Sequence, residues 1–238
     1  MSALDLVAAT AIVAGGAVLQ GSIGFGLGLF AVPLLLLLDT RLVPAPLLLA
    51  SGVLTILLTH RERHGIISDD LKWSLGGRFL GTLPALALLT LVPGERLGIA
   101  FAALVLLGVG LSASGWHFPP TPRVLLGAGA LSGFMATIAA IGGPPMALVY
   151  QRESGPRIRG TLSAYFVVGV AISLTGLAAV GRCGLMEIAL AAALLPGILT
   201  GFLVSRHTAR WLDRGYLRPA VLVVSAASAV LVIAKHWL

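Results

Sequence analysis

Charged side chains are scarce in this chain of 238 residues, of which only 11% are Asp, Glu, Lys or Arg. Soluble proteins carry about 25% charged residues. Hydrophobic residues make up 58% of the chain, and the mean hydropathy is +1.01. Such a composition excludes a water-soluble domain and requires lipid as the main solvent. The sequence therefore predicts a polytopic membrane protein whose surroundings are the lipid bilayer.

Cysteine and acidic residues are also rare, which limits the chemistry that the chain can perform. The single cysteine, Cys183, cannot form an internal disulfide, and one thiol makes a poor structural metal site. No Asp or Glu lies deep in an apolar segment, and Glu187, near the start of one, comes nearest to doing so. A proton relay of carboxylates is therefore not expected. We expect no cofactor and no metal, and the coupling ion, proton or sodium, is left open.

Basic residues outnumber acidic ones by 16 to 9, which gives a formal net charge of +7. They are scattered over short loops and form no soluble basic face, so nucleic acid is not an expected partner. In a membrane protein such an excess reports topology, because Lys and Arg accumulate in cytoplasmic loops.

Apolar runs bounded by charge define eight predicted elements, at 3–38, 43–60, 70–92, 95–115, 122–151, 158–181, 184–206 and 215–236. The first and the fifth are too long for one crossing. The first contains 33 consecutive uncharged residues, a length of about 50 Å as a helix, whereas the hydrocarbon core is about 30 Å thick.

Each overlong element contains a glycine-rich interruption, GSIGFGLG at 21–28 and IGGPP at 141–145. Membrane helices are broken by Gly and Pro only where protein or a watery cavity satisfies the freed backbone groups. Each overlong element is therefore predicted to be two short helices that meet inside the membrane. Two breaks at matching places in two halves of a chain indicate a substrate site.

The distribution of Lys and Arg indicates how the broken pairs cross the membrane. If both pairs return to the side where they begin, fifteen loop residues divide eleven to four between the two sides; if each pair crosses once, they divide nine to six. The positive-inside rule favours the returning arrangement, with both termini periplasmic or extracellular. The predicted fold is thus all-α, with two inverted repeats, 1–118 and 119–238, each a broken re-entrant helix pair followed by three transmembrane helices.

The second helix of each broken pair begins inside the membrane, where its unpaired N–H groups and positive dipole end attract anions. Pro144 suits the first turn of such a helix. Gln20, Ser22 and Thr137 add amide or hydroxyl groups. The predicted substrate-binding residues are Gln20, Ser22, Gly24, Gly26, Gly28, Arg78, Thr137, Gly142, Gly143 and Pro144. The alternative is that the glycines serve only close helix packing.

Arg78 lies well inside the third predicted element. A cation at that depth is costly unless it is paired or reaches the headgroups. Two interpretations stay open: Arg78 holds a substrate anion, or its long side chain extends back to the membrane surface.

The stretch Gly26-Leu-Gly28-Leu-Phe-Ala-Val-Pro33, its counterpart from Gly133 to Pro145 and the duplicated hydropathy pattern resemble the sulfite exporter TauE/SafE family of membrane proteins. The resemblance covers nearly the whole chain. It implies that sulfite, sulfoacetate, thiosulfate or a related organosulfur anion moves across the inner membrane, and it does not fix which anion.

Together these features predict a secondary transporter that alternates access around a midplane anion site. An anion channel would share the repeats and is one alternative. An intramembrane hydrolase is a weaker alternative, because Ser132 in the sequence Ala-Leu-Ser-Gly lacks a histidine in a later element to act as its base. We do not expect an enzyme.

Overall fold

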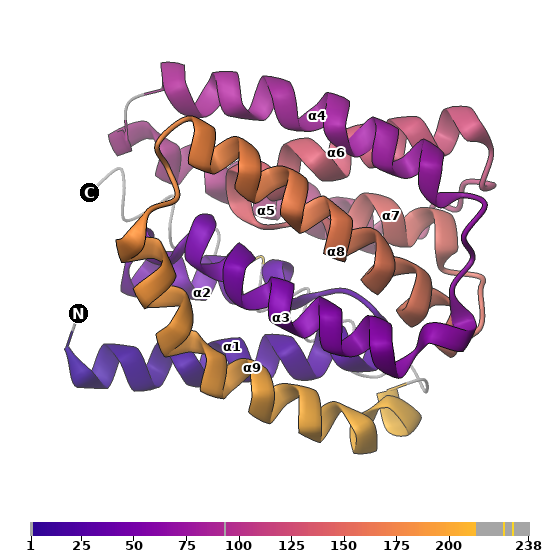
Figure 1. The fold of residues 1–238 in the computed structure, drawn as a ribbon, viewed down its shortest axis with the longest axis horizontal. Coiled ribbons are helices and arrows are strands. Elements are labelled where there is room, and N and C mark those ends of the chain that lie inside the picture. Colours follow the sequence, from indigo (N-terminus) through magenta and orange to yellow (C-terminus); the bar gives the residue numbers. More distant parts are fainter. Residues whose placement is uncertain (1, 93, 213–225, 227–229, 231–238) are drawn as a thin grey trace.

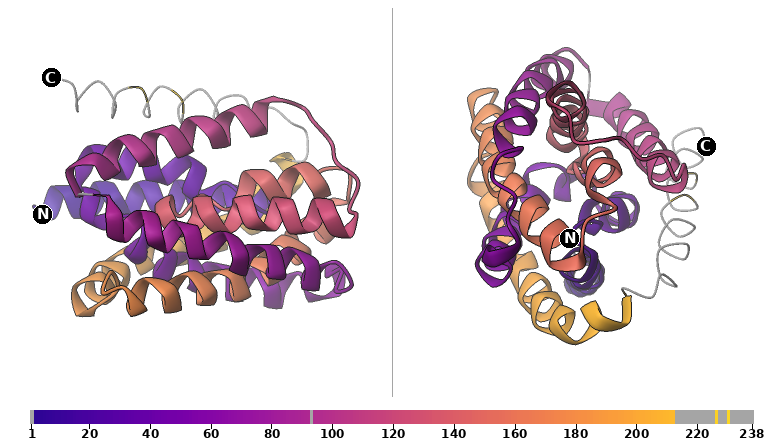
Figure 2. Two further views of the ribbon diagram at one scale, coloured as in Figure 1. Left: turned by 90° about the horizontal axis from the view of Figure 1, so that it is seen from above. Right: turned by 90° about the vertical axis from the view of Figure 1, so that its right-hand side faces the viewer.

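The computed structural model describes residues 2–92, 94–212, 226 and 230, and its regular elements there are all helical (Figure 1). The long helices run roughly along one common axis (Figure 2). The α-helices are α1 (Ala3–Ile23), α2 (Leu27–Leu38), α3 (Ala45–Arg61), α4 (Leu71–Leu91), α5 (Gly94–Ala113), α6 (Pro122–Ala139), α7 (Gly143–Tyr150), α8 (Gly155–Ala179) and α9 (Leu185–Leu212), with short 3-10 turns η1 (Thr40–Leu42) and η2 (Arg63–Gly65).

Five of these helices, α1, α4, α6, α8 and α9, are long and apolar enough to cross a membrane by length and composition. The chain is therefore an all-α, polytopic membrane protein, as predicted. The predicted element 215–236 lies almost wholly outside the described residues.

The overlong segment 3–38 is divided into α1 and α2, as the glycine spacing predicts. Gly24 ends α1 with a φ of 95°, and its N–H donates to the carbonyl of Gln20 at 2.8 Å. Gly26 precedes α2 with a φ of 121°. Both angles are costly for a residue with a Cβ, so glycine at these two positions determines where the helix breaks.

The overlong segment 122–151 is divided in the same way, into α6 and α7. Ala140 follows α6 in the left-handed conformation, with a φ of 57°. α7 then begins at Gly143 with two prolines in its first turn. The hydroxyl of Ser132 donates to the carbonyl of Gly142 at 2.6 Å, and this bond holds the connection between the two helices.

The two broken pairs return to opposite ends of the molecule (Figure 1). At the Arg61 end, α3 ends beside the start of α8, where the N–H of Ile67 donates to the hydroxyl of Thr161. At the Arg182 end, α8 finishes beside the end of α4, where Arg182 donates to the carbonyl of Leu89. The α1–α2 pair starts and finishes at the Arg182 end, and the α6–α7 pair at the Arg61 end. The inverted repeats, their boundaries and the membrane orientation stay predictions.

Two helix pairs, α4 with α6 and α1 with α9, pack through glycines at very short range. In each pair one helix belongs to residues 1–118 and the other to 119–238. Such close approach is typical of small residues in membrane helices. The contacts between a glycine and a backbone carbonyl are Gly77–Leu126, Gly81–Ala130, Gly129–Ser74 and Gly133–Arg78 in the first pair, and Gly197–Thr10 and Gly201–Ala14 in the second.

The neighbouring glycines 76 and 77 offer a matched test of this packing. A Cβ on Gly77 would overlap the carbonyl of Leu126, whereas a Cβ on Gly76 would meet only the Leu126 side chain at 3.9 Å. We expect Gly77→Ala to lower the free energy of unfolding by about 2 kcal/mol through overpacking. Gly76→Ala should raise it by up to about 1 kcal/mol through helix propensity. Thermal melting of the two purified variants measures the difference; equal melting temperatures would contradict the contact.

Candidate functional site

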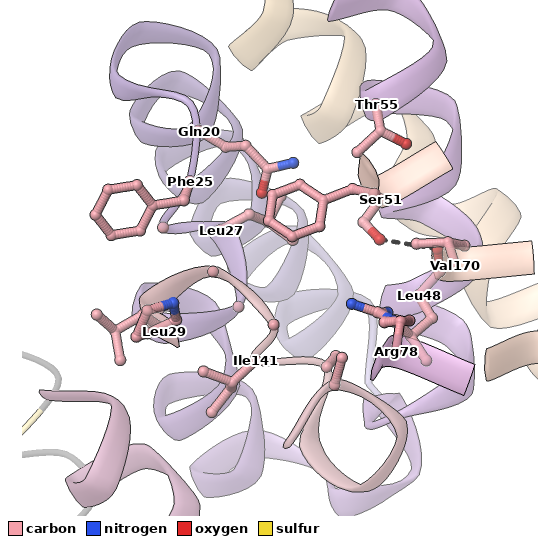
Figure 3. Close-up of a pocket in the computed structure, with 18 residues that line it drawn as sticks. Gln20, Phe25, Leu27, Leu29, Leu48, Ser51, Thr55, Arg78, Ile141 and Val170 are labelled. Atoms are coloured by element: carbon pink, nitrogen blue, oxygen red, sulfur yellow. Dashed lines mark hydrogen bonds between the residues drawn. The ribbon is translucent and has the colours of Figure 1, made fainter. Parts of the chain in front are cut away.

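The two helix breaks touch each other in the interior of the molecule. Gly28, at the start of α2, lies against the carbonyl of Ala140 with no room for a Cβ. Gly143, at the start of α7, lies against Phe25, whose Cβ would be 2.8 Å from a Cβ placed on the glycine. A cavity of about 40 Å³ adjoins this junction and is lined by both breaks together with α1, α3, α4, α6 and α8 (Figure 3).

The two helix starts that line the cavity differ in the number of backbone N–H groups left without an intrahelical acceptor. The first intrahelical bond at the start of α2 runs from the N–H of Phe30 to the carbonyl of Gly26. The N–H groups of residues 27–29 therefore have no intrahelical acceptor, and all three residues line the cavity. At the start of α7 only Gly143 supplies such a donor, because the prolines at 144–145 have no N–H. The first break thus contributes most of the backbone donors.

Arg78 of α4 is the charged side chain of the cavity, and it is only 1% exposed. Its two terminal nitrogens donate to the hydroxyls of Ser132 at 3.2 Å and Ser173 at 3.3 Å, and its Nε has no partner. The guanidinium lies 5.4 Å from the ring centre of Tyr165. No carboxylate pairs with Arg78 within the part of the chain that is described. The side chain does not reach the surface, which removes the headgroup interpretation.

Two glycines make room for this guanidinium. A Cβ on Gly169 of α8 would lie 2.8 Å from Cζ of Arg78, and one on Gly142 would lie 2.9 Å from a terminal nitrogen. Ser132 accepts a hydrogen bond from Arg78 and donates one to Gly142. The position of the cation is therefore fixed relative to the second break.

Neutral polar groups complete the lining. Gln20 of α1 is 6% exposed, and its side-chain amide makes no hydrogen bond to another described residue. Ser51 and Thr55, one turn apart on α3, donate to carbonyls of their own helix at 2.9 Å each. Figure 3 shows the Gln20 amide and the Arg78 guanidinium pointing into the cavity from different sides. With one cation, several donors and no acid in its lining, the cavity favours a small anion.

Most of the residues predicted from sequence meet at this cavity. Those that line it are Gln20, Gly26, Gly28, Arg78, Gly142, Gly143 and Pro144. The other three do not. The Ser22 hydroxyl donates to the carbonyl of its own helix at Val18 and pairs with that of Thr208 at 2.8 Å. Gly24 lies against the backbone of Arg159.

Thr137, the third, lies behind the cavity rather than in its wall. Its hydroxyl pairs with that of Ser173 at 2.9 Å and with that of Thr82 at 3.3 Å. Because Ser173 in turn accepts from Arg78, Thr137 belongs to the support of the guanidinium.

The lining residues that sequence reasoning missed include two polar ones, Ser51 and Thr55, and two aromatic ones, Phe25 and Phe166. The first two carried a readable signal, because polar residues four apart on an apolar helix share one face. The aromatic residues carried none, since phenylalanine is common throughout membrane helices.

Outside the membrane-spanning segments, the Arg182 end carries an ion pair between an exposed arginine and a partly buried aspartate. Arg41 donates to Asp39 at 2.7 Å, and these hydrogen bonds lower the pKa of the Asp39 carboxyl. No group of three or more His, Cys, Asp or Glu side chains that could hold a metal ion occurs among the described residues.

The protein is a bundle of helices able to cross a membrane, and its two interrupted helices meet at an interior cavity. These features place it among polytopic membrane proteins with a buried site. Residues 7–232 match the family model described as "Sulfite exporter TauE/SafE", which spans nearly the whole chain. The chain therefore belongs to the sulfite exporter TauE/SafE family, and the predicted resemblance is confirmed. This is a family of transporters, and membership is consistent with a protein that is not an enzyme. No curated protein and no solved structure matches the chain.

Proposed function

We propose that the protein is a secondary transporter that binds sulfite, sulfoacetate or a related sulfonate in the cavity between the two helix breaks. Family membership supports the substrate class. Arg78 supports the site: it is buried, has an unpaired Nε and no carboxylate partner among the described residues, and lies beside the second break. A buried cation is stable only when it is paired, and the substrate anion would be its partner.

The lining supplies the hydrogen bonds that an oxyanion needs. The oxygens of a sulfite or sulfonate group would accept from Arg78, from the N–H groups of residues 27–29 and from the amide of Gln20. Hydrogen bonds to a charged group each contribute about 1.5–3 kcal/mol, which offsets the loss of the anion's water shell. Phe25 and Phe166 leave an apolar wall against which a short carbon chain could lie.

The size of the cavity suits such a substrate. A cavity needs about 10–15 Å³ to hold one water molecule, so about 40 Å³ corresponds to a few waters. A small oxyanion displaces about that many. Larger organosulfur anions would require the cavity to widen during transport.

Transport would proceed by movement of the two halves about this site, which lies between them. The tight α1–α9 and α4–α6 pairs each join the halves. They would be the contact surfaces along which the halves rotate or slide against each other. We further propose that the chain lies in the cell (inner) membrane with the arginine-rich Arg61 end in the cytoplasm and both termini outside. Proton or sodium coupling belongs to the same proposal.

The alternatives differ in what they require. A channel would use the same cavity without gates. A hydrolase would need a base for Ser132, but that hydroxyl donates to the carbonyl of Gly142 and accepts from Arg78, and no described histidine bonds to it. The contacts of Ser132 are those of a structural residue.

Uptake of radiolabelled sulfite into proteoliposomes tests the transporter. We expect uptake that saturates with sulfite, depends on an imposed proton or sodium gradient and is inhibited by sulfonates but not by an uncharged sulfone. Flux that never saturates would indicate the channel. Uptake no faster than in empty liposomes, with folded protein and either gradient, would contradict the proposal.

A further inference from the structure

A second charged cluster lies at the Arg61 end, and we call it the Glu62 network: Arg61, Glu62 and Arg159. One carboxylate oxygen of Glu62 accepts from Nε of Arg61 at 3.0 Å and from Nε of Arg159 at 3.1 Å. The exposed fractions of these side chains are 18% for Arg61, 14% for Glu62 and 9% for Arg159. Charged groups so little exposed are costly to separate, because each loses its partner in poor contact with water.

The two arginines of the network also hold neighbouring helices. Arg61 donates to the hydroxyl of Ser205 on α9 at 2.8 Å and to the carbonyl of Gly21 on α1. Arg159, near the start of α8, donates to the carbonyl of Ser22 on α1 at 3.2 Å. Through three side chains the Glu62 network therefore ties α1, α3, α8 and α9 together.

This network lies directly beside the proposed anion cavity. The backbone of Arg159 packs on Gly24, where a Cβ would be 3.3 Å from the Arg159 Cα, and the next residue, Phe25, lines the cavity. Glu62, the residue directly after α3, follows Thr55 of the cavity wall by about two helical turns, a rise of about 10 Å. The Glu62 network stands between the first break and the Arg61 end.

The Arg182 end is built differently. A cavity of about 290 Å³ opens there, lined among others by Arg41, Leu97 and Arg182. Within the described part of the chain, Arg182 makes one hydrogen bond across the halves, which it donates to the carbonyl of Leu89 at 2.7 Å. A hollow of about 330 Å³ at the Arg61 end is lined from α5, α6 and α7 and includes no residue of the Glu62 network. Among the described residues the two ends therefore differ in the bonds that join the halves, which are charged and several at the Glu62 network and single at Arg182.

We propose that the Glu62 network is the gate of the anion pathway at the Arg61 end. Glu62 and Arg159 belong to different halves, so the halves cannot part at this end until Glu62 releases Arg159. Breaking the network opens the cavity toward the Arg61 end, while the intact network leaves access only from the Arg182 end. This inference rests on the proposed transport function and adds to it the residues that close one side.

Accessibility of a cysteine in the cavity wall tests the gate. In a Cys183→Ser, Ser51→Cys parent, an impermeant thiol reagent is applied from each side of oriented membrane vesicles. We expect slow labelling from the Arg61 side in this parent. Adding Glu62→Gln should speed labelling from that side about tenfold, which corresponds to about 1.4 kcal/mol in the gate equilibrium. Labelling at the parent's rate would overturn the gate.

A matched control comes from the exposed pair Glu153–Arg157, which is 3.4 Å apart near the start of α8. Glu153→Gln removes the same charge outside the network and should leave labelling unchanged. If Glu62→Gln does not fold, as judged by gel filtration and melting, Arg159→Lys keeps the charge but loses the donor fork, and it should also speed labelling. An unchanged rate in Arg159→Lys would overturn the gate equally.

The test separates the gate from the anion site. Stabilisation of the wild-type protein by sulfite is measured alongside. Faster labelling in Glu62→Gln without any sulfite effect would overturn the anion site and leave the gate in place. A sulfite effect with unchanged labelling would overturn the gate alone.

Discussion

Arg78→Gln is expected to reduce sulfite transport about 100-fold, because it removes the charged partner of the bound anion. Truncating one partner of a buried, hydrogen-bonded charge pair costs about 2–5 kcal/mol, and every 1.4 kcal/mol, approximately, is a factor of ten in affinity. Arg78→Lys keeps the charge but not the fork, so it should recover only part of the activity. Initial rates of sulfite uptake in proteoliposomes measure both effects.

Replacing Arg78 is expected to impair transport but to increase the stability of the fold. In the absence of anion, Arg78→Met should raise the free energy of unfolding by about 1–2 kcal/mol, since a buried cation without a carboxylate is replaced by an apolar side chain of similar length. Neither serine is orphaned by the change: Ser132 keeps its bond to Gly142, and Ser173 keeps that to Thr137. A gain in stability with loss of transport is the signature of a functional residue.

Arg157→Gln is the control for Arg78, because Arg157 is exposed and paired with Glu153 away from the cavity. Its transport and melting temperature should equal those of the wild type. Full transport by Arg78→Gln would contradict the role given to this arginine.

Gly28→Ala carries the second large expected effect. The added Cβ would overlap the carbonyl of Ala140, which is backbone and cannot turn aside like a side chain. We expect a loss of about 2–4 kcal/mol of stability and no measurable transport, because the two breaks are forced apart. Melting temperature and sulfite uptake of the purified variant measure the two losses.

Alanine substitutions at two other glycines show how much of the loss comes from steric overlap and how much from backbone strain. Gly127→Ala on α6 places its Cβ in open space and should be neutral or stabilising by up to about 1 kcal/mol. Gly26→Ala meets nothing nearer than 3.6 Å but must adopt a φ of 121°, so it should cost about 1–2 kcal/mol through the backbone alone. Wild-type stability of Gly28→Ala would mean that the breaks do not touch.

The helix breaks could be predicted because they follow from local rules. A run of 33 uncharged residues is too long for one crossing, and the glycines at 24 and 26 permit the φ values that end one helix and start the next. The prolines at 144–145 mark the first turn of α7 for the same kind of local reason. No knowledge of the tertiary fold is needed for these steps.

The membership of the site was harder to predict, because it depends on which face of each helix turns inward. Ser22 is two residues beyond Gln20, about 200° around the helix, so the two cannot face one cavity. Thr137 fails in the same way, since the neighbouring Ala136 is the residue of α6 that lines the cavity. A residue's distance in sequence from a helix break therefore did not predict whether its side chain lines the cavity. The direction in which the side chain leaves the helix decided it.

Whether the Arg78 side chain is buried or reaches the membrane surface depends on contacts with distant parts of the chain. Its depth in the span left a ligand role and a headgroup role equally open. The burial is decided by Ser132, Ser173 and Gly169, which come from helices far away in sequence. Gly77 and Gly81 have the same spacing as Gly197 and Gly201, 120 residues later, and each of these pairs packs against a helix of the other predicted half.

The most direct test of the anion site is the melting temperature of the purified protein with increasing sulfite, for the wild type and Arg78→Gln. A ligand at 100 times its Kd stabilises a protein by about 2.7 kcal/mol, which for a chain of this size is about 5–10 °C. We expect a rise of this order in the wild type, little in Arg78→Gln, and none with chloride at equal ionic strength. Equal shifts in both proteins, or no shift in the wild type at any sulfite concentration, would contradict an anion site built on Arg78.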